Sequence, residues 1–199
     1  MHFYLYLFVD IFSRKVVGWQ VYDRESSELA AELIRDICLR LEISPGQLVV
    51  HSDNGSPMKG ETVLATLQRL GVSHSRSRPS VSNDNPYSES LFRTLKYRPQ
   101  MPVKPFEDIH HARRWVTELV RWYNYEHRHS SIRFVTPTQR HAGIDKALLE
   151  KRNALYKCAR QANPTRWSGS TRNWDPITEV HLNPNKPKIK ESNNILKAA

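Results

Sequence analysis

The sequence is poor in cysteine and has no long apolar run. Its 199 residues include two cysteines, too few for a disulfide framework or a four-ligand zinc site, which fits a reducing compartment. The most apolar stretch, residues 3–12, contains Asp10 and is about half the length of a membrane span. It also lacks the basic start and small-residue cleavage site of a signal peptide. These absences argue against export and a membrane span, and we interpret the stretch as a β-strand.

Positive charge is unevenly distributed along the chain. Residues 1–89 contain 9 lysines and arginines against 11 acidic residues, whereas residues 90–199 contain 21 against 9. The net charge of +10 therefore arises after Glu89. This asymmetry is typical of a nearly neutral core joined to a surface that binds a phosphate backbone, although a basic solubilising face would give the same pattern. Hydrophobic residues make up 39% of the chain, enough for one globular domain with an extension.

The hydrophobic pattern predicts an α/β domain with a mixed sheet. A hairpin with its turn at Ser13-Arg14 precedes alternating helices and strands, and Asp84 or Asn85 can cap the helix that contains Glu89. We expect a core over residues 1–144 and a basic helical extension with a loosely ordered tail over residues 145–199. The predicted strands are 3–10, 15–22, 47–52 and 72–75, and the predicted helices are 26–41, 61–70, 86–98, 107–127, a short one from 136, and 145–162.

The stretch HSDNG, residues 51–55, places an acid where a buried strand leaves its sheet. Asp53 there is either a turn-former or a metal ligand held on a rigid element. A metal site needs a second carboxylate, and Glu89 is a candidate. At about 100° per helical residue, Glu89, Arg93 and Lys96 lie within about 40° of one line, while Leu91 and Leu95 point elsewhere. Such a face can bind a metal and the neighbouring phosphates of DNA, or it can be an ordinary surface charge set.

Two segments together resemble a known family. VVHSDNGS, residues 49–56, and SRPSVSNDNPYSESLFRTLKYRP, residues 77–99, resemble the catalytic core of bacterial insertion-sequence transposases related to retroviral integrases, the insertion-sequence-three family. Asp53 and Glu89 are separated by 35 residues, the spacing of the second and third catalytic carboxylates in that family. FYLYLFVDIFSRKVVGWQVYD and WYNYEHRHSSIRFVTPTQRHAG resemble its hairpin and the segment after its catalytic helix. The resemblance covers most of residues 3 to about 183.

The resemblance implies a ribonuclease-H-like fold and a transposase that cuts and joins DNA by metal-dependent phosphoryl transfer. In the family, two Asp and one Glu hold two Mg²⁺ ions, or Mn²⁺ in their place, which stabilise the attacking and leaving oxygens. Asp53 and Glu89 match the second and third of these carboxylates, and Lys96 and Arg93 match positions that contact DNA. The resemblance also implies DNA (element ends and target) as a partner, a homo-oligomer on DNA, and a bacterial cytoplasmic protein that associates with the nucleoid when bound to DNA.

The chain departs from the family at its first catalytic Asp. That residue belongs to a strand before the hairpin, and no matching segment is present in the printed sequence. Asp10, the only carboxylate on the early strands, could substitute for it, but Asp10 matches a different family position, where capping the Ser13-Arg14 turn is its simpler role. The missing strand would lie in the middle of the sheet, between the hairpin and residues 47–52, so neighbouring backbone groups lose partners. We therefore expect the isolated chain to be unstable.

Three readings of function follow. The first is an active transposase catalytic domain, the second is an inactive truncated form that binds DNA or intact transposase subunits, and the third is a decayed reading frame. The DNA upstream of Met1 would separate them.

Several other residues are better explained by packing than by chemistry. The pairs His110-His111 and His127/His129 suit packing or phosphate contact better than metal binding, and Trp115, Trp122 and Tyr123 suit the core. Trp167 and Trp174 could stack on bases, dock on a partner subunit, or be disordered.

Overall fold

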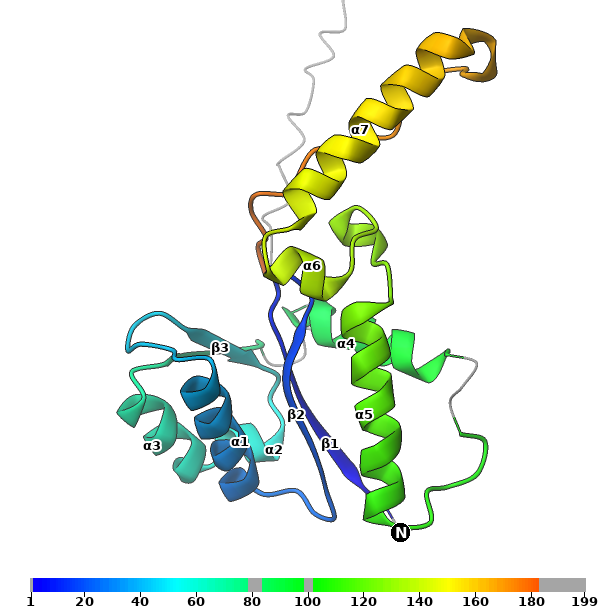
Figure 1. Cartoon of the computed structure of the whole chain (residues 1–199). Helices are drawn as coiled ribbons and strands as arrows, with labels where there is room; N and C mark the ends of the chain where they lie inside the picture. The colour runs from blue at the N-terminus through cyan, green and yellow to red at the C-terminus, as the bar shows by residue number, and fades with distance from the viewer. Residues whose placement is uncertain (1, 79–83, 99–101, 183–199) are drawn as a thin grey trace, which may run out of the picture.

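The computed structural model describes residues 2–78, 84–98 and 102–182. Two small sheets and their helices form the body, and the long helix α7 extends from one end of it (Figure 1). None of the helices in these ranges is long and apolar enough to cross a membrane.

The first sheet is a hairpin. β1 (Tyr4–Val9) pairs antiparallel with β2 (Val16–Tyr22), with a shift in register between Phe8 and Val9. Asp10 holds the turn because its carboxylate accepts hydrogen bonds from the backbone N–H groups of Phe12 and Ser13 and from the Ser13 hydroxyl. The turn-capping role predicted for Asp10 is confirmed.

The second sheet pairs β3 (Val49–Ser52) with β4 (Ser73–Arg76) in parallel. The connection between them contains α2 (Ser56–Lys59), which the sequence did not predict, and α3 (Glu61–Arg69). Ser26 is the N-cap of α1 (Ser27–Arg40), and its side chain accepts hydrogen bonds from the N–H groups of Glu28 and Leu29. α1, α3 and the sheet enclose one core: Ala30, Ala31, Ile34, Cys38, Val50, Val63, Leu67 and Val72.

The two sheets are not joined by hydrogen-bonded strands in the described part of the chain. β1 lies between two cores: Tyr6 and Phe8 contact the α1–α3 core, whereas Leu5, Leu7 and Val9 contact a second core under α5. Every β1 residue nevertheless keeps some exposure, and none is fully buried. The mixed sheet predicted from the sequence is therefore present in two parts, with β1 and β3 each paired on one side.

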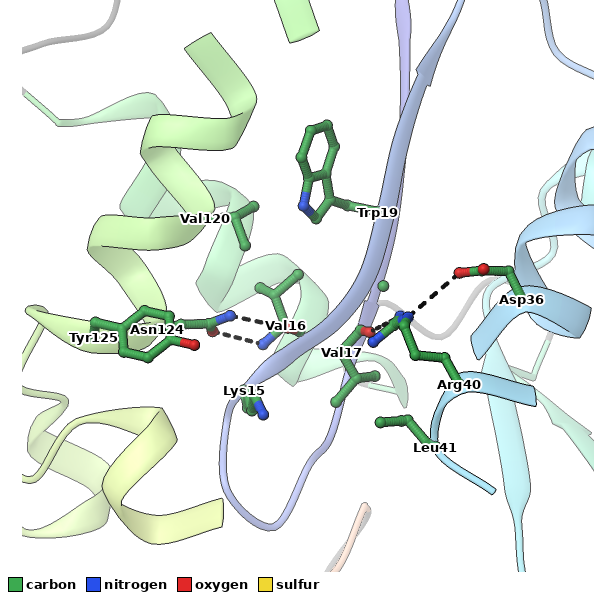
Figure 2. A pocket seen from close by; sticks show the side chains of 11 residues that line it. Lys15, Val16, Val17, Trp19, Asp36, Arg40, Leu41, Val120, Asn124 and Tyr125 are labelled. Atoms are coloured by element: carbon green, nitrogen blue, oxygen red, sulfur yellow. Dashed lines mark hydrogen bonds and ion pairs between the residues drawn. The ribbon is translucent and has the colours of Figure 1, made fainter. Parts of the chain in front are cut away.

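α4 (Pro86–Lys96) and α5 (Ile109–Tyr125) cover the hairpin. α5 buries one face, which includes Ala112, Val116 and Tyr123, and the core role predicted for Tyr123 is confirmed. The Asn124 side chain accepts a hydrogen bond from the Val16 N–H at 2.9 Å and donates one to the Val16 carbonyl at 3.0 Å, so it acts as a partner for the outer edge of β2 (Figure 2).

The segment after α5 consists of η2 (Ser130–Ile132), α6 (Pro137–His141), α7 (Asp145–Ala162) and η3 (Pro164–Arg166). Thr136 begins α6 in a capping box with Gln139.

The described tail after η3, residues 167–182, has no helix or strand, in keeping with the predicted loose extension, but one side chain anchors it. Trp174 is 6% exposed and packs with Ile132, Val135 and Leu149, so residues near it return along α7 and dock on this chain. An apolar anchor far from its partners in sequence leaves no periodic signal, which is why the burial of Trp174 was not predicted. Residues 183–199 lie outside the described residues.

Candidate active site

Asp53 lies directly after β3 and is exposed. One of its carboxylate oxygens accepts the Gly55 N–H at 3.0 Å, which makes Asp53 a turn-former. Because this bond uses one oxygen, a second role as a metal ligand is chemically compatible with it. An exposed carboxylate on a strand end is also a hard oxygen ligand of the type that Mg²⁺ prefers.

Glu89, Arg93 and Lys96 are all exposed on α4, whereas Leu91 and Leu95 are 2% and 6% exposed. The two faces predicted for this helix are therefore present. Glu89 lies in the first turn and the two cations lie in the last turn. A carboxylate near the helix N-terminus and cations near the C-terminus each interact favourably with the helix dipole. The arrangement places one acid and two cations on one surface.

Ser77 connects the Asp53 segment to the end of β4. Its N–H donates to the Ser52 carbonyl at 3.0 Å, and its carbonyl accepts from the Asn54 side-chain amide at 2.8 Å. Both chain neighbours of Asp53 are thus tied to Ser77. The loop that carries Asp53 is fixed against the strand from which the chain proceeds toward α4.

Arg78 and Asp84 connect that strand end to α4. The Asp84 carboxylate is buried, with a side chain 3% exposed, and accepts three hydrogen bonds from Arg78: one from the backbone N–H at 2.7 Å and two from the Nε and Nη2 groups of the guanidinium, each at 3.0 Å. The carboxylate raises the pKa of Arg78. Asn85 takes the N-cap position of α4 without a side-chain hydrogen bond. The predicted N-cap position, Asn85 before Pro86, is therefore confirmed, but Asn85 makes no side-chain capping bond and the Asp84 carboxylate binds Arg78.

Sequence reasoning missed this pair. Both residues lie in a stretch interpreted as a loop, where no periodicity shows which side chains meet. An acid next to the start of a predicted helix, with an arginine six residues earlier, was the available signal. Ser77, Arg78 and Asp84 together link the segments that carry Asp53 and Glu89.

A third metal-binding carboxylate does not join them in the described part of the chain, where no group of three His, Cys, Asp or Glu side chains is placed to hold a metal. Asp10, considered as a substitute, is engaged elsewhere. Burial raises the pKa of its carboxyl, but hydrogen bonds from Ser13, Phe12 and His141 outweigh this and lower it. His141 Nδ1 lies 3.2 Å from the carboxylate. The described residues thus offer two carboxylates that suit a divalent cation.

His127 and His129 pack together with Tyr123. The His127 ring stacks on Tyr123 with centroids 5.5 Å apart, and His129 meets His127 edge-on at 5.6 Å. Burial, His127 and Arg14 lower the pKa of His129 to about 4. A neutral, ring-packed imidazole confirms the packing interpretation for this pair. Trp115 and Trp122 also pack against the core under α5, as predicted.

Neither of two clefts in the described part of the chain is lined by Asp53 or Glu89. One of about 460 Å³ lies between β2 and the ends of α1 and α5 (Figure 2). Arg40 faces it, but donates to the Val17 carbonyl at 2.7 Å, and neither Asp53 nor Glu89 lines it. The other, of about 380 Å³, is mainly apolar and includes Lys96. The candidate carboxylates therefore lie on exposed surface, which suits a large polymeric substrate better than a small enclosed ligand.

Comparisons with known proteins agree with this arrangement. Residues 1–82 and 70–137 match profiles described as integrase core domain. The chain is 32% identical over 135 residues to the transposase for insertion sequence element IS904 of Lactococcus lactis, covering 67% of this chain and 53% of that protein. It is 31% identical over 93 residues to transposase InsF for insertion sequence IS3A of Escherichia coli, covering 47% of this chain and 32% of that protein. The chain thus spans 53% of the first relative and 32% of the second.

A solved structure shows the same fold. The simian T-cell lymphotropic virus intasome, determined by cryo-EM in complex with the PP2A regulatory subunit B56 gamma, aligns with a TM-score of 0.50 and 17% identity. The alignment covers 68% of this chain and 46% of that one. The fold expected from the sequence, an integrase-like or ribonuclease-H-like α/β core, is supported. The chain belongs to the insertion-sequence-three family of transposases, which have an integrase-like catalytic core.

Proposed function

We propose that this chain is the catalytic part of a transposase that cuts and joins the ends of its element, with Asp53 and Glu89 as metal ligands. The observation that carries the proposal is the exposed face of α4 (Glu89, Arg93 and Lys96), whose first turn is linked to the Asp53 segment through Ser77 and the Arg78–Asp84 pair. The relatives named as transposases support the same reaction class.

Each residue has a distinct task in this reaction. Asp53 supplies its carboxylate oxygens from the loop directly after β3, which Ser77 holds in place, and Glu89 supplies its own from the helix α4. Mg²⁺, or Mn²⁺ in its place, would stabilise charge on the attacking and leaving oxygens during in-line attack on phosphorus. Arg93 and Lys96 bind phosphates and so fix the DNA end relative to the carboxylates.

The substrate and assembly follow from the same proposal. The element ends and the target DNA are the partners, and pairing two ends requires more than one copy of the chain. The protein then acts in the bacterial cytoplasm, on the nucleoid when DNA is bound. The net charge of +10, which arises after Glu89, supports attraction to a polyanion.

A binding-only function is the second candidate. It is favoured by the commitment of the Asp10 carboxylate to its turn and to His141, which leaves two candidate carboxylates in the described residues. Such a protein would hold DNA or join intact transposase subunits without cutting.

Strand cleavage and transfer on labelled DNA with the element's ends test both candidates. The native chain and the variants Asp53→Asn and Glu89→Gln are compared for product and, in parallel, for end binding by gel shift. We expect each variant to lose product by about a hundredfold or more while keeping its end affinity, since each removes a metal ligand with little change in shape. End binding without any product from the native chain would favour the binding-only function. Undiminished product from either variant would overturn the catalytic assignment.

A further inference from the structure

The chain after α7 is anchored by one tryptophan. Trp174 is buried against Ile132, Val135 and Leu149, and its ring meets Tyr156 edge-on at 5.2 Å. The guanidinium of Arg152 lies 5.4 Å from the same ring. Burying a tryptophan contributes strongly to stability, so this contact is a firm starting point for the residues that follow. We call residues 174–181 the strap.

Two arginines hold the strap by its backbone. Arg133 donates to the Asp175 carbonyl at 3.2 Å, and Arg140 donates to the Ile177 carbonyl at 2.8 Å. The Arg140 side chain is fully buried, lies 3.6 Å from Asp145, and also donates to the Phe12 carbonyl at 2.7 Å. The strap is therefore fixed to η2, to α6 and, through Arg140, to the hairpin turn. These bonds use backbone acceptors, so they do not depend on the side chains of the strap.

The far end of the strap reaches the candidate catalytic helix. Tyr87 lies in the first turn of α4, and its hydroxyl donates to the His181 carbonyl at 2.7 Å. Arg14 of the hairpin turn covers a face of the same ring, with its guanidinium carbon 4.0 Å from the ring centroid. Tyr87 thus joins three segments that are distant in sequence. It precedes Glu89 by two residues.

We propose that Tyr87 is a positioning residue, which the strap and Arg14 hold in place so that the first turn of α4, and with it Glu89, keeps its orientation. α4 has eleven residues and no side-chain hydrogen bond at its N-cap, so its first turn depends on tertiary contacts. The Arg78–Asp84 pair supplies one contact before the helix begins, and Tyr87 supplies another within it. The role in catalysis rests on the proposed function, but the mechanical role does not.

Amide hydrogen exchange of the full 199-residue chain, without metal or DNA, tests the mechanical role. Tyr87→Phe removes the hydroxyl donor and keeps the ring under Arg14, whereas Trp174→Ala releases the anchor of the strap. We expect exchange in the first half of α4 to rise about fivefold in Tyr87→Phe and about tenfold in Trp174→Ala, with α3 unchanged. Tyr97→Phe, at an exposed ring past the end of α4, and Trp167→Ala, at the half-buried tryptophan beside Tyr156, are the matched controls.

If strap amides exchange faster in Trp174→Ala but α4 keeps its native rate in both test variants, the strap does not hold α4 and the proposal is wrong. If Trp174→Ala unfolds as a whole, the conservative Tyr87→Phe variant decides alone.

The DNA-cleavage assay then separates this proposal from the proposed function. Tyr87→Phe should lower kcat about fivefold and leave KM for DNA unchanged, because the hydroxyl positions Glu89 and does not contact DNA. An unchanged kcat together with faster exchange in α4 would overturn the positioning role. Full activity of Asp53→Asn would instead overturn the proposed function, while the exchange result on α4 would stand.

Discussion

The buried carboxylate of Asp84 accepts the Arg78 backbone N–H and two guanidinium hydrogen bonds. This pair spans the segment that leads from β4 to α4. Because Ser77, its neighbour, binds the residues on both sides of Asp53, the pair is part of a continuous connection between the two candidate metal ligands.

Replacement of Asp84 tests that connection. Asp84→Asn keeps the shape but removes the charge, and we expect a loss of about 1 to 3 kcal/mol in the free energy of unfolding, since hydrogen bonds to a charged group are lost. Urea titration measures the change. Arg93→Ala, at an exposed arginine on α4, should change stability by less than about 0.5 kcal/mol. Equal changes in the free energy of unfolding for the two substitutions would show that the Arg78–Asp84 pair contributes no more to stability than an exposed side chain.

The lowered pKa of His129 makes the stability of the folded chain depend on pH. Its pKa is lowered from 6.5 to about 4 by burial, with His127 and Arg14 adding to the effect. As the pH falls below about 6.5, the unfolded chain takes up a proton that the folded chain takes up only near pH 4. The contribution of His129 is therefore complete above about pH 6.5, declines between there and about pH 4, and is constant below.

Urea midpoints from about pH 7 to about pH 4 measure this decline. We expect the midpoint of His129→Gln to fall less over that range than the midpoint of the native chain. His110→Gln, at an exposed histidine, serves as the control and should follow the native curve. Parallel curves for the native chain and His129→Gln would contradict the assignment.

The proposed contact of Lys96 with a DNA phosphate predicts that its removal changes the salt dependence of DNA binding. If it neutralises one phosphate, Lys96→Ala should weaken binding and reduce the slope of log affinity against log salt by about one unit. Fluorescence anisotropy at several salt concentrations measures the slope. Arg35→Ala removes an equal charge from the exposed side of α1 and should leave the slope unchanged. A slope lowered equally by both substitutions would indicate general attraction to the whole protein.

The division of the strands into two sheets predicts low cooperativity of folding. β1 and β3 each have one hydrogen-bonded neighbour among the described strands, and β1 keeps some exposure along its length. We expect the 199-residue chain to unfold over a broad denaturant range and to be cut readily by protease within the hairpin. Circular dichroism and limited proteolysis check this. A sharp transition with protease resistance would refute it.

Local sequence signals were sufficient for much of the fold. α7 occupies the predicted residues 145–162, because its helical pattern extends over many turns. The helix α4 has the predicted buried and exposed faces, and Asp10 caps the predicted turn, since both features depend on neighbours within a few residues.

Contacts across long sequence separations could not be predicted in the same way. Trp174 packs on Leu149 and Ile132, and Tyr87 bonds to His181, yet neither contact has a periodic signature. Arg140 is buried and binds backbone carbonyls from two other segments, which nothing in its local sequence predicts. The candidate site follows the same division: its carboxylates came from motif spacing, whereas the Ser77, Arg78 and Asp84 connection required the structure.

The most direct test of the account is the position of Mn²⁺ in crystals of this chain, located by its anomalous scattering. The account predicts a peak within coordinating distance of carboxylate oxygens from both Asp53 and Glu89, and its loss in Glu89→Gln. Carboxylates on opposite sides of the molecule, or a peak bound by one of them that persists in Glu89→Gln, would contradict it.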